Sequence, residues 1–214
     1  MSDIKECRSY DFEVRADQNE EHGHFVAGRA IVFNQSYDNG WFTEIIEPEA
    51  LNDTDMKDVR LLVNHNTDMI PLARSRNNNA KSTMQLSVVP YEGLDIRADL
   101  DVDRNGTAME LYSAADRGDL TGMSFMFTVN GERWEDLDSE HPTRYITGIR
   151  KIFEVSACTW PAYEQTTFEA RQADAGALES AQAVLESARA DRNAEERSER
   201  IRLLKLRIKR IKEA

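Results

Sequence analysis

A serine, a histidine and a glutamate in this sequence have side chains that could together carry out nucleophilic catalysis. Ser124 lies within the apolar run 122–128, where strand alternation places Ser124 and Met126 on the face opposite to Phe125. A hydroxyl in such a strand needs a hydrogen-bond partner. Ser124 is therefore either a nucleophile or a serine bonded to neighbouring backbone. The α/β-hydrolase elbow is disfavoured, because Met126 stands where its second glycine belongs.

His65 comes after Asn64 and the apolar run 61–63, at the end of an expected buried strand. A histidine held at a strand end is a candidate general base, because its ordinary pKa is close to neutrality. A structural, hydrogen-bonded histidine is the alternative. The pair His22 and His24 could bind a metal ion, but no third histidine and no cysteine lies nearby in the sequence, so we predict no metal site there.

Glu154 lies in the run 150–156, where alternation places it on one face with Ile152 and Ser156. A carboxylate within such a strand is costly to bury unless it meets a cation or a histidine N–H. An ion pair with Arg150 on the same face and a catalytic role beside a histidine are both open. A catalytic acid would orient the histidine and compensate its charge.

The segments that must position these residues are mostly strands. Alternating or β-rich runs, each bounded by Gly, Asn, Asp or Pro, occur at 9–14, 25–33, 42–46, 84–89, 94–100, 123–129 and 145–155. Their spacing predicts a mainly antiparallel sheet or barrel. Helices are expected over 107–117, just before Gly118, and in a short turn that begins near Pro48. The predicted fold class is mainly β with peripheral helices.

Charge is distributed unevenly along the chain. The 214 residues include 27 basic and 39 acidic side chains, which give a net charge of −12. Residues 200–214 hold seven basic side chains and one acid, so the rest of the chain has a net charge of −18. An acidic body argues against a general phosphate-binding surface, and we therefore predict no nucleic-acid partner.

The segment 172–214 is expected to form one helix, because it has no Pro, a single Gly and many strong helix formers. Its apolar stripe consists of Ile201, Leu204, Ile208 and Ile211. The stripe is too short for a stable coiled coil alone, so either a partner or a second copy completes it, or the tail is solvated and frays. We divide the chain into a domain over 1–171 and a helical, basic amphipathic tail over 172–214.

Several kinds of site and location are not expected. The longest apolar run has four residues, 30–33, and the first residues lack the apolar core of a signal peptide, so we expect a cytosolic chain without a membrane partner. Cys7 and Cys158 are too few for a disulfide framework or a zinc cluster. There is no Gly-rich phosphate loop and no HExxH motif, so no cofactor is expected.

Five motifs follow one another between about Gly28 and Thr167. They are GRAIVFNQSYDNGWFTEIIEPEAL, LLVNHN with PLAR after it, EGLDIRADL, GDLTGMSFMF and IRKIFEVSACTWPAYEQT. The most specific pieces are the Asn-His pair after an apolar strand, the Gly-x-Ser-Phe strand, and the Glu-Val-Ser strand that ends in Pro161-Ala162. This ordered set resembles the prohead (procapsid) maturation proteases of tailed bacteriophages with HK97-like capsids.

The resemblance implies a serine endopeptidase with Ser124 as nucleophile, His65 as general base and Glu154 as the third member of the triad. It also implies a fold like that of the herpesvirus assemblin proteases, an antiparallel β-barrel with surrounding helices, here with a C-terminal helical extension. The chain has Glu-Ala-Leu at 49–51 and Leu-Ala-Arg at 72–74, where the family commonly has Gly-Ala-Phe and Leu-Gly-Arg. Neither departure touches the three implied catalytic residues.

The resemblance further implies that the protein acts inside the procapsid, in the host cytoplasm. Such proteases cut the scaffold protein, or the scaffolding segment of the major capsid protein precursor, and also themselves. The tail over 172–214 would dock on acidic scaffold helices or associate with a second copy, and self-cleavage within 173–190 would remove it. Two alternatives are a non-enzymatic assembly or scaffold-binding factor, in which Ser124, His65 and Glu154 merely satisfy one another, and a fused protease and scaffold.

Overall fold

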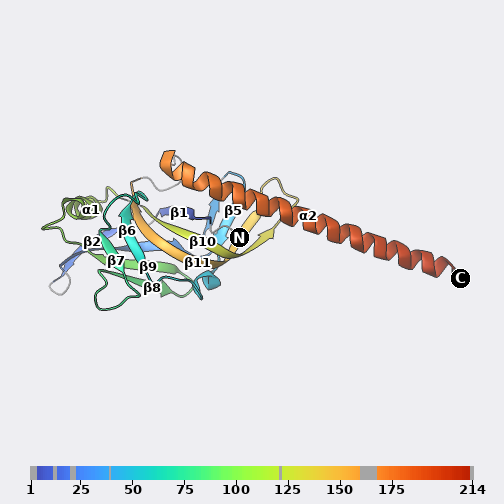
Figure 1. Cartoon of the computed structure of the whole chain (residues 1–214), viewed down its shortest axis with the longest axis horizontal. Coiled ribbons are helices and arrows are strands. Elements are labelled where there is room, and N and C mark those ends of the chain that lie inside the picture. Colours follow the sequence, from blue (N-terminus) through green and yellow to red (C-terminus); the bar gives the residue numbers. More distant parts are fainter. Residues whose placement is uncertain are drawn as a thin grey trace.

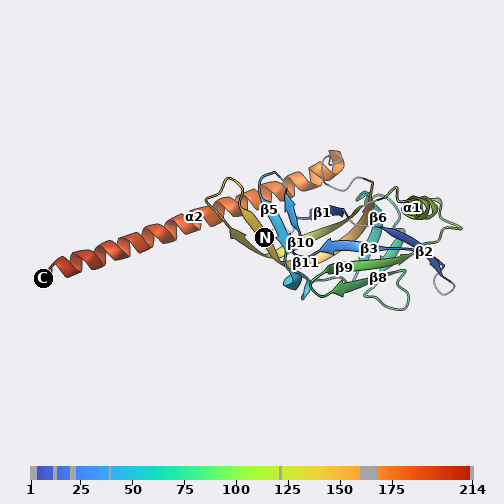
Figure 2. The ribbon, with the colours of Figure 1, turned by 180° about the vertical axis from the view of Figure 1, so that it is seen from behind.

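The computed structural model describes residues 4–11, 14–19, 23–38, 40–120, 122–159 and 168–212. Its elements are β1 Glu6–Asp11, β2 Arg15–Asn19, β3 Gly23–Val32, β4 Ser36–Asp38, β5 Thr43–Ile46, the 3₁₀ helix η1 Pro48–Leu51, β6 Val59–Val63, β7 Ala73–Ser75, β8 Met84–Val89, β9 Gly93–Asp99, α1 Gly106–Asp116, β10 Gly122–Glu135, β11 Thr143–Cys158 and α2 Phe168–Lys212. The strands gather into one body, and α2 begins beside this body and extends far beyond it (Figures 1 and 2).

The strands pair into two sheets. The larger has seven strands in the order β1-β10-β11-β5-β4, with β6 paired to β11 and β7 paired to β6. The smaller has the order β2-β3-β9-β8. The two longest strands, β10 and β11, form an antiparallel hairpin whose register shifts between Met126 and Glu132. Such irregularities bend a hairpin, and the two ends of β11 accordingly have different neighbours, β5 and β6.

The predicted fold class, mainly β with helices, is confirmed. The predicted barrel is wrong, because the described strands pair into two open sheets. The two sheets meet where the Thr83 N–H donates to the Arg74 carbonyl at 3.0 Å. A barrel requires a hydrogen-bonded ladder that closes on itself. Moreover, β5 and β6 lie parallel to β11. Side-chain alternation reports faces and carries no information about strand direction.

Most expected elements occur, with shifted ends. Strand β8 has the predicted bounds, and α1 and η1 lie within one or two residues of the expected helices. The side chain of Asn105 caps α1 by accepting hydrogen bonds from the Thr107 and Ala108 N–H groups. The strand expected over 9–14 occurs as β1, from Glu6 to Asp11. Three short strands, β2, β4 and β7, were not predicted, because segments of three to five residues carry little periodic signal.

The helix expected over 172–214 occurs as α2, which begins earlier, at Phe168. Its first half packs on the strands: Ala181 and Leu185 are buried, and the Arg189 guanidinium donates to the carbonyls of Leu137 and Ser139. Further along, where α2 leaves the body, the apolar side chains Ile201, Leu203, Leu204 and Leu206 are exposed. The side chains of Ile208 and Ile211 are not among those that the structure describes. No helix in the described ranges is long and apolar enough to cross a membrane.

Candidate active site

Three neighbouring strands bring the three predicted site residues together. Ser124 lies on β10 and Glu154 on β11, where Ser124 pairs with Ser156 and Met126 pairs with Glu154. His65 follows the end of β6, which runs parallel to β11 over the segment that contains Glu154. The Nε2 atom of His65 lies 2.5 Å from the Ser124 Oγ, and its Nδ1 atom lies 2.5 Å from the Glu154 Oε1.

The predicted alternation of β10 explains why Ser124 faces away from the main core. Met123, Phe125 and Phe127 all belong to the hydrophobic core, whereas the side chains of Ser124 and Glu154 are buried on the other face with 0% and 3% exposure. Polar groups at that depth require partners. His65 is a partner of both side chains, so the hydroxyl, imidazole and carboxylate form one buried row.

The turn that presents His65 has an unusual backbone. Asn64 and His65 have φ angles of 52° and 57°, in the left-handed region that non-glycine residues rarely occupy. Asn64 holds this turn in place: its Oδ1 accepts from the Thr159 N–H at 2.9 Å, and its Nδ2 donates to the Thr159 hydroxyl at 2.8 Å. Backbone strain of this kind persists where the surroundings enforce it, and it concentrates at functional sites.

Ser156 joins the histidine turn to the carboxylate, and the sequence analysis did not identify this role. Its hydroxyl donates to the Glu154 Oε2 at 2.6 Å and accepts from the His65 backbone N–H at 3.1 Å. Its side chain is fully buried. The same alternation that singled out Glu154 places Ser156 beside it, and that was the available signal. Pro161 and Ala162, which were part of the resembling motif, lie outside the described residues.

The electrostatic environment favours a protonated His65. Burial alone lowers the pKa of the imidazole, but the neighbouring Cys158 side chain and the hydrogen bond and negative charge of Glu154 outweigh it and raise the pKa to about 10. The Cys158 side chain itself is buried, with its sulfur 3.8 Å from the Ser156 carbonyl oxygen. At neutral pH the His65 ring is therefore an imidazolium.

The hydrogen bonds of Ser124 agree with this protonation state. A serine hydroxyl has a single proton to donate. The Ser124 hydroxyl donates it to the backbone carbonyl of Arg8 on β1, at 2.7 Å. The Nε2 atom of His65 must then be the donor to Ser124, while its Nδ1 donates to Glu154. The structure therefore describes a state in which His65 holds both ring protons and has no free lone pair to act as a base.

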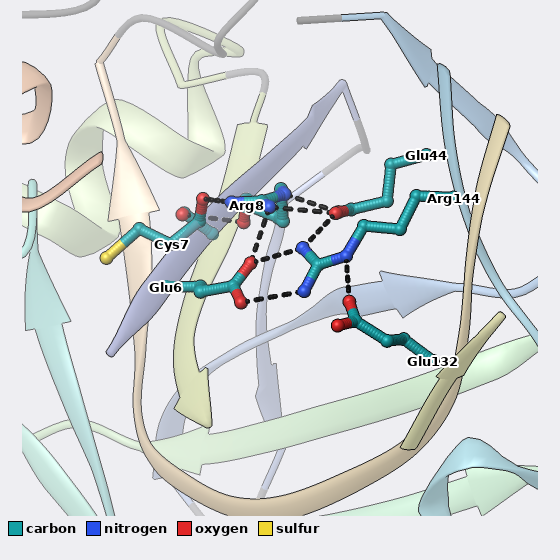
Figure 3. A network of polar contacts seen from close by, with 7 residues as sticks. Glu6, Cys7, Arg8, Glu44, Glu132 and Arg144 are labelled. Carbon is teal, nitrogen blue, oxygen red and sulfur yellow. Dashed lines mark hydrogen bonds and ion pairs between the residues drawn. The ribbon is translucent and has the colours of Figure 1, made fainter. Parts of the chain in front are cut away.

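A buried network of charges fixes β1 beside the site (Figure 3). The Arg8 guanidinium contacts Glu44 and Glu6, and Arg144 contacts both of these carboxylates and also Glu132. Arg8, Glu6, Glu44 and Arg144 are each at most 5% exposed. Burial by itself would raise the pKa of Glu44, but the charges and hydrogen bonds of Arg8 and Arg144 hold it below its usual range. The network thus ties β1 to β5, β10 and β11.

Replacing Arg144 by methionine is expected to lower the free energy of unfolding by about 3–5 kcal/mol, because Glu6 and Glu44 would lose a buried partner. Urea denaturation measures the change. Arg117→Met is the matched control, since the Arg117 side chain is 65% exposed and pairs with Asp119 at the surface. Such surface pairs contribute about 0–1 kcal/mol. Equal losses in the two variants would contradict the assignment of Arg144 as a buried anchor.

Within the described residues, no group of three or more His, Cys, Asp or Glu side chains could hold a metal ion. His22 lies outside the described residues. The ring of His24 packs edge-on against Tyr112, with ring centroids 4.8 Å apart. That contact is typical of a histidine that packs against a neighbouring side chain.

Comparison with known proteins assigns the chain to a family. The sequence model of the caudovirus prohead serine proteases matches residues 10–180. The prohead protease of Enterobacteria phage HK97 is 28% identical over 170 residues, which cover 77% of this chain and 68% of that protein. No solved structure matches the chain. The family match includes all three residues of the buried row, and the chain belongs to the caudovirus prohead serine protease family.

Proposed function

We propose that the chain is a serine endopeptidase of phage capsid maturation, with Ser124 as nucleophile, His65 as general base and Glu154 as the residue that orients and charges the imidazole. The observation that carries the proposal is the unbroken row from the Glu154 carboxylate through His65 to the Ser124 hydroxyl, with both contacts at 2.5 Å. Membership of the prohead serine protease family supports the same roles.

Each step of peptide hydrolysis has a group in this row. The Ser124 Oγ bonds to the carbonyl carbon of the substrate while its proton passes to the Nε2 of a neutral His65. The imidazolium that forms is stabilised by Glu154 and gives the proton to the leaving amine, which breaks the peptide bond. Water then attacks the acyl-enzyme, with His65 again taking a proton. His65 then returns this proton to the Ser124 Oγ as the acyl–oxygen bond breaks, which releases the acid product and regenerates the serine.

The substrates that suit this role are the scaffold protein, or the scaffolding segment of the major capsid protein precursor, inside the procapsid. Residues 1–171 would form the protease domain, and 172–214 would bring it to scaffold or to a second copy. The exposed apolar side chains of α2, together with its basic end, support such docking. Self-cleavage within 173–190 and kinship with the assemblin fold belong to the same proposal.

Labelling with a fluorophosphonate and cleavage of co-expressed scaffold or capsid precursor together test the proposal. Mass spectrometry of the labelled chain should locate the phosphonate on Ser124, and the precursor should be shortened. The exposed Ser87 on β8 should remain unlabelled. A chain that neither reacts with the reagent nor shortens itself or either precursor would remove the support for an endopeptidase and favour the alternative of a non-enzymatic assembly factor.

Ser156→Ala is expected to lower kcat about tenfold with KM unchanged, because the Glu154 Oε2 and the His65 N–H both lose their partner. Leaving such buried groups unsatisfied also costs about 1–3 kcal/mol of stability. Peptide hydrolysis and thermal unfolding of the purified variant measure the two effects. Ser87→Ala is the matched control, and a Ser156→Ala chain with full kcat would show that Ser156 positions neither group.

A further inference from the structure

The proposed nucleophile is covered by the chain's own N-terminal strand. Ser124 is 0% exposed, and β1 lies antiparallel to β10 with Ser9 opposite Ser124. The Arg8 carbonyl oxygen accepts the hydrogen bond of the Ser124 hydroxyl at 2.7 Å. A serine attacks the carbonyl carbon, whereas here its hydroxyl donates to the carbonyl oxygen. The strand therefore occupies the site in an arrangement that is not poised for cleavage, and it must move before a substrate can enter.

The backbone of β10 is suited to bind a peptide in place of β1. In the seven-stranded sheet β1 is an edge strand, and it pairs with β10 over residues 122–127, on both sides of Ser124. When β1 leaves, β10 becomes an edge strand whose N–H and C=O groups are unpaired. An extended peptide that adds to such an edge restores the hydrogen-bonded ladder. In the register of β1, its carbonyl at the position of Arg8 would lie beside Ser124.

The charges around Arg8 indicate which side chain fits this register. Arg8 is opposite Phe125, so its guanidinium lies on the sheet face away from the Ser124 hydroxyl, where it contacts Glu44. Glu6 belongs to β1 and leaves with it. Among the described residues of the network, Glu44, Glu132 and Arg144 then remain. Glu44 is 1% exposed and loses one of its two guanidinium partners, and a cation in the place of Arg8 restores that contact.

We propose that β1 is an internal occupant of the substrate site along β10, and that the peptide substrate replaces it in the same register with Arg or Lys where Arg8 stands. The inference rests on the proposed function, because it assigns to that enzyme a cleavage preference C-terminal to a basic residue. It also assigns latency: the Arg8 carbonyl takes the proton that Ser124 would otherwise donate to His65.

Releasing β1 is the first test. Arg8→Gln removes the contacts with Glu44 and Glu6, and we expect fluorophosphonate labelling of Ser124 to become at least about tenfold faster than in the wild type. Loss of the fold would separate Ser124 from His65 and lower the rate, so a gain in rate by a folded chain indicates release of β1. The control is Glu92→Gln, which breaks the surface contact with Arg29 on the other sheet and should leave the rate unchanged. A folded Arg8→Gln chain that labels no faster than the wild type overturns the proposal.

The second test holds β1 in place with a cross-link and leaves the charges of the buried network unchanged. Cys7 is opposite Met126 in the β1–β10 register, so Met126→Cys allows a disulfide between the two strands. The oxidised chain should lose at least about 90% of its labelling and peptide hydrolysis, and dithiothreitol should restore both. The same variant with Cys7→Ser should not respond to oxidant. A fully cross-linked chain that hydrolyses peptides as fast as its reduced form overturns the proposal.

Peptide selectivity is the third test. Quenched fluorescent peptides that differ only in the residue before the scissile bond should be cut at least about tenfold faster with Arg or Lys there than with Leu, and slowest with Glu. Glu44→Gln should reduce the preference for Arg over Leu. Equal rates for all four peptides overturn the register assignment. If no variant labels Ser124 and no peptide is cut, the proposed function fails; labelling that neither Arg8→Gln nor the cross-link alters overturns only this inference.

Discussion

Replacing Ser124 by alanine should lower kcat/KM for peptide hydrolysis by at least about 10,000-fold, and His65→Ala should cost about as much. The reason is that the two groups act as one unit: without the hydroxyl there is no nucleophile, and without the imidazole its proton has no acceptor 2.5 Å away. The double variant should therefore be no slower than either single variant. Initial rates with a quenched fluorescent peptide measure all three chains.

Mass spectrometry of the same chains during storage is a parallel measurement. The wild type should shorten with time, while Ser124→Ala and His65→Ala stay intact. Ser87→Ala changes an exposed serine on β8 and should behave as the wild type. Residual activity above one tenth of the wild-type rate in Ser124→Ala would remove that residue from the role of nucleophile. Full activity in His65→Ala would do the same for the general base.

Glu154→Gln should change both the rate and its pH dependence. In the proposed mechanism the neutral imidazole is the base, so the wild-type rate should rise with pH up to about 10, the pKa of His65. Removing the carboxylate removes a hydrogen bond and a negative charge that raise this pKa, and burial then lowers it. The rising limb should move to lower pH. The plateau rate should fall by about 100- to 10,000-fold, since the imidazolium loses its stabilising partner.

The same pair makes a prediction about stability. The pKa of His65 is raised in the folded chain from 6.5 to about 10, so the folded state holds the proton more tightly than the unfolded state. The resulting stabilisation is complete below about pH 6.5, declines above it and is gone above about pH 10. Thermal unfolding in Glu154→Gln should lack this decline. If the pH–rate profile and the pH dependence of thermal unfolding of Glu154→Gln were both identical to those of the wild type, Glu154 would not belong to the site.

Much of the candidate site could be predicted because its members stand out locally. Ser124 and Glu154 are polar residues in strands whose neighbours alternate, and His65 follows a run of apolar residues. On β10, alternation predicted Phe125 and Ser124 on opposite faces, and only Phe125 belongs to the hydrophobic core. On β11, Ile152 was expected on the face of Glu154 but belongs to the core, because the register shifts between Met126 and Phe127. The catalytic roles themselves came from the ordered motifs. They stay predictions until the variants are measured.

Other features could not be read from the sequence, because they depend on which segments meet. Nothing in the composition of β1 indicates that it pairs beside Ser124, or that a backbone carbonyl there accepts the hydroxyl proton. The parallel course of β6 along β11 decides that His65 reaches Glu154. His65 lies 59 positions from Ser124 and 89 positions from Glu154 in the sequence. Contacts between residues so far apart leave no periodic pattern in the sequence.

The sequence by itself determined the residue types, the strand faces, the two helices and the division of charge between an acidic body and a basic end. It did so because side-chain periodicity and helix propensity are local properties. The tertiary structure decided the pairing of the strands, and with it two open sheets, the protonated state of His65 and the enclosure of Ser124 by β1. These depend on hydrogen bonds and burial between distant segments, which only the assembled fold brings into contact.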